Sequence, residues 1–64
     1  MKIDKIQDDG ERFIIHGTNI HDELQSIFDN IALGVTVSKH EDKSHVLYTE
    51  NNRDIVLRIL NEKT

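Results

Sequence analysis

Residues 19–34 read NIHDELQSIFDNIALG, and the spacing of their apolar side chains decides the expected fold. The pattern predicts a helix over about residues 19–33. Its N-cap is Thr18 or Asn19, whose side-chain oxygen can accept a free backbone N–H, and Gly34 suits the left-handed residue that ends a helix. The apolar residues recur at the three- and four-residue intervals of an amphipathic helix: Ile20, Leu24, Ile27, Phe28 and Ile31.

A hairpin is expected before this helix. The dipeptide DG at residues 9–10 is a strong turn signal, because a type I′ turn needs positive φ at both central positions. A two-residue loop there pairs Ile6 with Phe13 and places both on one face. Ile3 and Ile14 fall on the other face. The alternation is imperfect, which suggests a bulge near the turn.

The second half of the chain repeats this order less clearly. Residues 35–40 and 45–50 alternate as strands, and the polar residues 41–44 connect them. Residues 53–62 follow as a helix, with Asn51 as N-cap in a capping-box pattern. The competing interpretation is a buried strand. The predicted core face of the helix consists of Ile55, Val56, Ile59 and Leu60.

These elements predict an α+β fold, β-β-α-β-β-α, in one domain of residues 1–64. The sheet has four mostly antiparallel strands, and both helices pack on one face. The two helical segments also match in pattern at an offset of 32, which fits either a structural duplication or any two amphipathic helices. The matched pairs are Asn19 with Asn51, Asp22 with Asp54, Leu24 with Val56, Ile27 with Ile59, and Phe28 with Leu60.

Charge and composition exclude several classes. The 12 acidic and 8 basic side chains give a net charge of −4, which disfavours direct nucleic-acid binding. No Lys or Arg lies between Phe13 and Ser38, so an acidic helix face of Asp22, Glu23 and Asp29 is the expected partner-binding surface. The chain has no cysteine, and no apolar run suggests a signal peptide or membrane span. A cytoplasmic protein is expected.

No catalytic motif is present, and we expect a protein that is not an enzyme and uses no cofactor. Phosphate loops, nucleophile elbows and HExxH patterns are absent. The four histidines form two pairs with the same spacing. His16 and His21 flank a strand–helix joint, whereas His40 and His45 flank a turn and are weak candidates for a metal site. Local structural roles and a pH response near 6.5 are the other interpretations.

The expected function is a small intracellular regulatory module that docks on a partner protein, in the style of small inhibitors from mobile elements. A chain this short has a marginal core, so a homodimer is expected. The apolar surface of the second helix is wider than one sheet needs, and the expected dimer interface is Leu57, Ile55 and Leu60. The alternatives are an acidic nucleic-acid mimic that inhibits a DNA-binding protein, and a histidine-based metal-binding protein.

Overall fold

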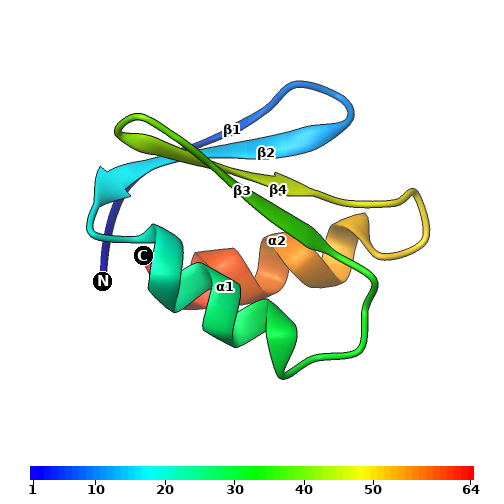
Figure 1. The fold of residues 1–64 in the computed structure, drawn as a ribbon. Helices are drawn as coiled ribbons and strands as arrows, with labels where there is room; N and C mark the ends of the chain where they lie inside the picture. Colours follow the sequence, from blue (N-terminus) through cyan, green and yellow to red (C-terminus); the bar gives the residue numbers. More distant parts are fainter.

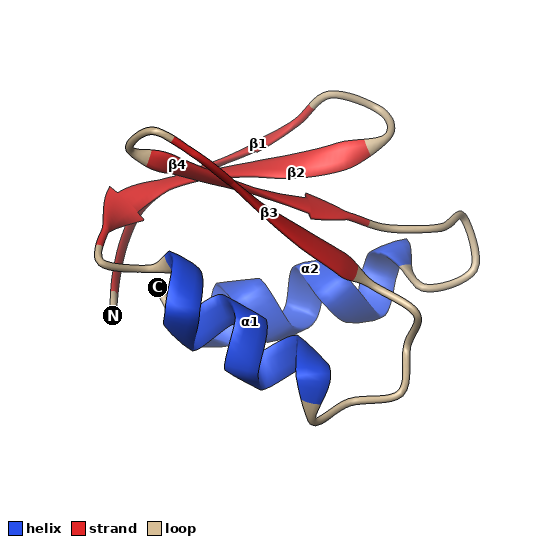
Figure 2. Ribbon diagram, viewed as in Figure 1, coloured by secondary structure: helices blue, strands red, loops and turns tan.

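One open sheet of four antiparallel strands, with both helices on the same face, makes up the protein (Figures 1 and 2). The structure is a computed structural model that describes residues 1–64. The strand order β1-β2-β4-β3 leaves β1 and β3 at the edges, and the predicted α+β order is confirmed. The elements are β1 (Lys2–Asp8), β2 (Arg12–Thr18), α1 (His21–Asp29), β3 (Thr36–His40), β4 (Lys43–Leu47) and α2 (Arg53–Glu62).

The turn of the first hairpin lies one residue later than predicted. Ile6 pairs with Ile15, not with Phe13. The Asp9 carboxylate accepts hydrogen bonds from the Glu11 and Arg12 N–H groups, at 3.1 and 3.0 Å. This side chain therefore organises the loop, as Asp does in Asx turns, and only Gly10, at φ +96°, needs the left-handed region.

A bulge between Ile3 and Lys5 lies at the far end of this hairpin rather than near the turn. Since one extra residue reverses the alternation, Ile3 pairs with Gly17 and packs on the core. The prediction that Ile3 lies on the face opposite to Phe13 is wrong for this reason. Glycine is required at position 17, where β2 pairs with β1 beside the bulge, because a Cβ there would lie 2.3 Å from the carbonyl oxygen of Lys2.

Helix α1 is shorter than the predicted 19–33. Its N-cap is Ile20, and no side chain caps the first turn, so the predicted capping by Thr18 or Asn19 is wrong. Asn19 instead has φ +54°. The Asn30 side chain donates to the carbonyl of Ser26 at 2.9 Å, which competes with continued helix.

Residues 53–62 form a helix, which excludes the strand interpretation. The N-cap is Asn52 rather than Asn51, and its side chain makes no cap bond. The Asn52 amide instead accepts from the Thr49 N–H at 2.8 Å and donates to the Leu33 carbonyl at 2.7 Å. Asn52 is 6% exposed, so this buried amide ties the loop before α2 to the loop after α1.

The second hairpin is tighter than predicted. Its turn is Glu41-Asp42, and Lys43 and Ser44 belong to β4 rather than to a four-residue connection. Glu41 has φ +52°, the sign that Gly10 has in the first turn. The core lies between the sheet and the helices, and its members are Phe13, Ile15, Ile20, Leu24, Phe28, Val37, Val46, Val56 and Leu60.

The two β-β-α halves are related by an approximate two-fold axis between β2 and β4, because exchanging the halves leaves the strand order unchanged. In the hairpins Lys39 pairs with Ser44 as Asp8 pairs with Phe13, an offset of 31 residues. In the helices the offset of 32 noted in the sequence holds. The equivalent positions Leu24 and Val56, and Phe28 and Leu60, are buried in both halves.

Neither helix is long and apolar enough to cross a membrane.

Candidate functional site

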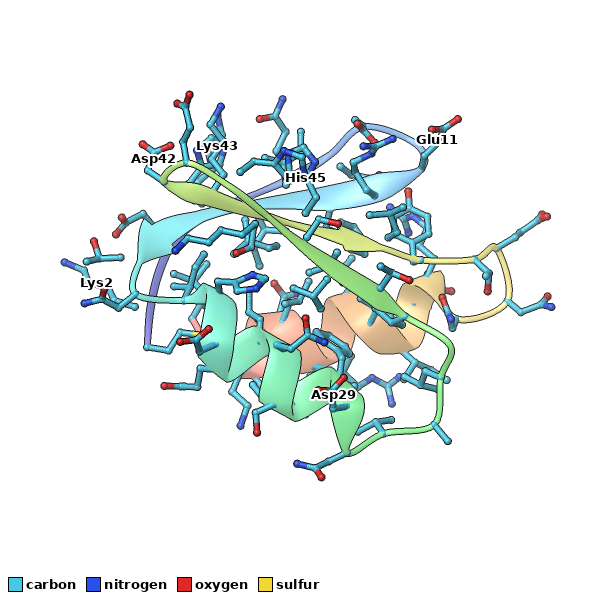
Figure 3. The ribbon with its side chains drawn as sticks, in the orientation of Figure 1. Lys2, Glu11, Asp29, Asp42, Lys43 and His45 are labelled. Carbon is cyan, nitrogen blue, oxygen red and sulfur yellow. The ribbon has the colours of Figure 1, made fainter.

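The face of the sheet opposite the helices is uncovered, and this face is the candidate site. Figure 3 shows Lys43 and His45 projecting from it, away from the helices. Since successive strand residues point to opposite faces, the buried positions of β2 and β4 identify the residues that project outward. They form three rows across the sheet: Lys5, His16, Lys43 and His40; Gln7, Ile14, His45 and Ser38; and Arg12, Leu47 and Thr36.

The uncovered sheet face is basic, although the whole chain has a net charge of −4. Its rows contain three cationic side chains and three of the four histidines, and the carboxylates nearest to them are those of Asp9 and Glu11, which pair with Arg12 at the end of the third row. The cations are Lys5, Arg12 and Lys43. The acidic residues lie in the hairpin turns, on the helices and at the sheet margin, where the Asp9 carboxylate lies 3.5 Å from Nε of Arg12. The composition therefore conceals a charge separation that only the strand order reveals.

The cations of the uncovered face affect the pKa of His45. Burial lowers the pKa of His45 from its ordinary value of 6.5, and His40, Arg12 and Lys43 lower it further. Asp9 acts in the opposite direction. The Nδ1 atom of His45 is buried and has no hydrogen-bond partner, so no group of the chain compensates a charge on this imidazole there.

The two weak metal candidates do come together on this face. The rings of His40 and His45 stack with their centroids 3.8 Å apart and their planes at 22°. No group of three or more His, Cys, Asp or Glu side chains is placed to hold a metal ion. Because zinc needs at least three converging protein ligands, the pair does not by itself form a metal centre.

The uncovered face has two apolar side chains among its polar ones, Ile14 in the middle row and Leu47 in the last row. Ile14 and Leu47 are half-buried there although no helix covers them, and Ile14 pairs directly with His45. No Phe or Tyr ring lies on this face, because Phe13 and Tyr48 lie on the helix-covered side, with their ring centroids 4.6 Å apart. Apolar side chains among polar ones are common in protein interfaces.

A second polar group, which we call the Asp8 cluster, lies at one end of the helix-covered side. It consists of Asp8, Tyr48 and Arg53, lying against Phe13. The Tyr48 hydroxyl and the Arg53 guanidinium both donate to the Asp8 carboxylate, and the guanidinium lies 5.5 Å from the centroid of the Phe13 ring. The hydrogen bond from Tyr48, with those from the Gly10 N–H and Arg53, lowers the pKa of Asp8 to about 2.

The predicted acidic helix face is exposed. Asp22, Glu23 and Asp29 all face solvent on α1. Two of them have partners within the chain, because Glu23 lies 3.3 Å from the N-terminal ammonium of Met1 and Asp29 accepts a hydrogen bond from Gln25 at 2.9 Å. The three carboxylates do not converge on a common point.

The three residues predicted to form a dimer interface on α2 differ in how far they are exposed. Leu60 is completely buried in the core of its own chain and has no surface to give to a partner. Ile55, predicted to face the core, is 48% exposed and is the one large apolar side chain in that state. Leu57 is half-buried and packs against the core. Ile55 and Leu57 thus remain as candidates for an interface.

Sequence reasoning missed both the basic face and the Asp8 cluster. Asp8 and Arg53 are 45 residues apart in the chain, and no local pattern relates them. The alternation of Arg12, Ile14 and His16 along β2 was visible, but its meaning depends on which strands flank it. Comparisons with protein-family models, with curated proteins and with solved structures each found no match.

Proposed function

We propose that this chain is a non-enzymatic protein-binding module whose uncovered sheet face docks an acidic segment of a partner protein. The observation that carries this proposal is that the first two cross-strand rows bring together Lys5, Lys43 and three histidines without a carboxylate, in a chain with a net charge of −4. A face of one sign attracts a partner of the opposite sign and orients it during encounter. Lys5 and Lys43 supply the unpaired fixed charge, whereas Arg12 already lies 3.5 Å from the Asp9 carboxylate and 3.2 Å from the Glu11 carboxylate.

A protein partner suits this face better than a nucleic acid. Ile14 and Leu47 offer apolar contacts to which a phosphate backbone has nothing to contribute. The aromatic rings on the face are three imidazoles, and two of them, His40 and His45, already stack on each other. Acidic residues also project beside it, from the two hairpin turns. Figure 3 shows Glu11 at one turn and Asp42 at the other. Because these carboxylates repel anions at both ends of the face, only a short acidic segment of a partner can bind between them favourably.

A second copy of the same face is a poor occupant. Two copies brought together about a two-fold axis would place cations and histidines against cations and histidines, which costs free energy. The acidic partner segment is therefore taken to belong to another protein, with glutamate or aspartate side chains around an apolar residue that meets Ile14 and Leu47.

Charge reversal on the face tests the proposal. The probe is a fluorescently labelled peptide of glutamates around a central leucine, with binding measured by anisotropy at several salt concentrations. Lys43→Glu should weaken binding by about tenfold or more, since it replaces attraction with repulsion. Lys63→Glu makes the same charge change in the exposed segment after α2 and should stay within about twofold of the parent.

Two outcomes contradict the proposal. If Lys43→Glu and Lys63→Glu bind the peptide alike, the uncovered face is not the docking surface. If a short DNA duplex binds more tightly than the peptide and Lys43→Glu abolishes that binding, the occupant is a nucleic acid and not a protein.

A homodimer through α2 is the second candidate, and the exposure of Ile55 favours it. The size of the chain does not by itself demand a second copy, because the surface of 4202 Å² is that of a folded monomer of this mass, about 4,200 Å². Light scattering of the parent and of Leu57→Glu tests the dimer. A parent that remains monomeric at high concentration, with a variant of equal stability, contradicts it.

A further inference from the structure

The two ends of the helix-covered side are equivalent under the approximate two-fold axis, but they carry different side chains, and each end has a pocket. The Asp8 cluster lies at the first end. The residues equivalent to Asp8, Phe13, Tyr48 and Arg53 are Lys39, Ser44, Gly17 and His21, in that order. Two aromatic rings of the first end are thus replaced by a hydroxymethyl group and a hydrogen atom. The pocket at the first end is bordered by the mutually paired Asp8, Tyr48 and Arg53, whereas the pocket at the second end is bordered by Ser44, whose hydroxyl has no partner.

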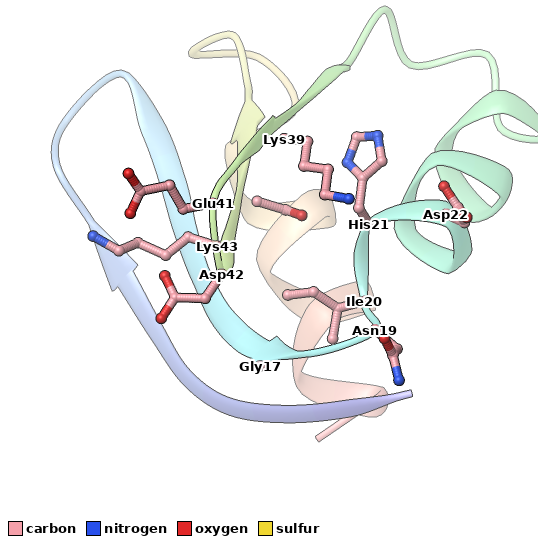
Figure 4. Close-up of a pocket in the computed structure, with 10 residues that line it drawn as sticks. Gly17, Asn19, Ile20, His21, Asp22, Lys39, Glu41, Asp42 and Lys43 are labelled. Atoms are coloured by element: carbon pink, nitrogen blue, oxygen red, sulfur yellow. The ribbon is translucent and has the colours of Figure 1, made fainter.

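The pocket at the second end has a volume of about 220 Å³. It lies between the joint that leads from β2 into α1 and the turn that connects β3 with β4 (Figure 4). Figure 4 shows the Lys39 ammonium turned toward His21, whereas Glu41 and Asp42 project from the opposite side. Ile20 is the one apolar residue among those that line the pocket.

Polar groups around this pocket lack partners within the protein. Ser44 is completely buried, and its Oγ makes no hydrogen bond. The Nδ1 atom of His21 is likewise buried and unpaired. Lys39 takes part in none of the ion pairs, although acidic residues line the same pocket. A buried hydroxyl without a partner is costly, so its presence beside a cation points to a ligand.

The first turn of α1 adds donors to the same place. No side chain caps this turn, and the first N–H groups of a helix have no partner within it. His21 and Asp22, the first two residues of the helix, line the pocket. The positive end of the helix dipole therefore meets the ammonium of Lys39 and the hydroxyl of Ser44, which together favour negative charge. The carboxylates of Asp22, Glu41 and Asp42 also line the pocket, so an anion binds only where the first three groups outweigh them.

We propose that this pocket binds a small oxyanion, as a carboxylate or phosphate group, on Ser44, Lys39 and the N-terminus of α1. A metal cation is the poorer occupant, because no three side chains of ligating type converge anywhere in the chain. The proposed ligands Ser44 and Lys39 lie on the helix-covered side of the sheet, opposite to His45, although Lys43 of the uncovered face also lines the pocket.

The test is a titration of the labelled chain with sodium acetate and, separately, with inorganic phosphate, followed by NMR amide shifts at constant ionic strength. Saturable changes should appear at Gly17, Asn19, His21 and Ser44 with at least one of the two anions. The stronger of the two identifies the source as carboxylate or phosphate. Chloride at equal ionic strength should leave these amides unchanged.

Two variants and one control make the test decisive. Lys39→Met should weaken binding about tenfold, because it removes a charge-assisted hydrogen bond, and Ser44→Ala should weaken it while leaving the fold intact. Lys5→Met removes the same charge from the uncovered face and should change the affinity less than about twofold. The proposal is overturned if neither anion produces saturable shifts at the pocket, or if Lys39→Met and Lys5→Met bind alike.

Discussion

Ser44 occupies in the second half of the chain the position that Phe13 occupies in the first. Phe13 pairs with Asp8, and Ser44 pairs with Lys39, at the same places in their hairpins. Both residues are buried, with 1% and 0% of their surfaces exposed. Because an aromatic ring and a hydroxymethyl group stand at equivalent positions, Phe13 packs against Tyr48 at one end of the helix-covered side, whereas the Ser44 hydroxyl at the other end has no partner.

Ser44→Ala should therefore stabilise the ligand-free chain. The buried Oγ has no partner, and removing an unsatisfied hydroxyl recovers about 1 kcal/mol of desolvation cost. Denaturant unfolding in a buffer without oxyanions measures the change. If the variant is less stable than the parent, the Ser44 hydroxyl already has a hydrogen-bond partner in the ligand-free chain. A bound anion is then not needed to satisfy it.

Asn52→Ala should destabilise the fold by about 2 kcal/mol, because it leaves the Thr49 N–H and the Leu33 carbonyl without their partner. Asn51→Ala is the matched control. Asn51 is exposed and makes no side-chain hydrogen bond, so its replacement should change stability by less than about 0.5 kcal/mol. Equal losses for the two variants, measured by thermal unfolding, would contradict this account of the loops.

Asp8→Asn should lower the melting temperature at neutral pH and lose its effect in acid. The pKa of Asp8 is lowered from 3.8 to about 2, so the folded protein favours the carboxylate. The stabilisation is present above pH 3.8 and disappears as the pH falls toward about 2. Melting curves of parent and variant should converge there. Asp4 is exposed and has no ion pair. The melting temperature of Asp4→Asn should therefore equal that of the parent both at neutral pH and in acid.

His45 should make the fold less stable in mild acid. Its pKa is lowered in the folded state, so the unfolded chain binds more protons, and stability falls as the pH drops from 6.5 through the lower folded value. His45→Gln should flatten this part of the profile, measured by denaturant unfolding. A pH profile that is the same in parent and variant would contradict the positive surroundings of His45. The charged and titratable groups around it are Arg12, His16, His40, Lys43 and Asp9.

The element order could be predicted because its signals are local. The helical spacing from Ile20 to Phe28 and the alternation of Val35 and Val37 depend only on near neighbours. Element ends were less accurate, since they depend on side chains that compete for the backbone. Asp9 shifted the first turn by one residue, and Asn30 ended α1 early.

The candidate sites could not be predicted because they depend on strand order. The basic face exists because β2 pairs with β4, which places Arg12 beside Leu47 and His16 beside Lys43. No pattern along the chain specifies that pairing. The net charge of −4 instead suggested that the partner-binding surface is acidic. The pocket likewise depends on a two-fold relation that equates Gly17 with Tyr48, two residues with no resemblance in the sequence.

The central claim is that the uncovered sheet face, and not the acidic helix, is where this chain meets its partner. The most direct measurement is an NMR map of the amides that shift when the glutamate peptide is added. The account predicts that the shifts concentrate at Lys5, Ile14, Lys43, His45 and Leu47 and disappear at high salt. Shifts confined to α1 and α2, or none at all with this peptide, would contradict it.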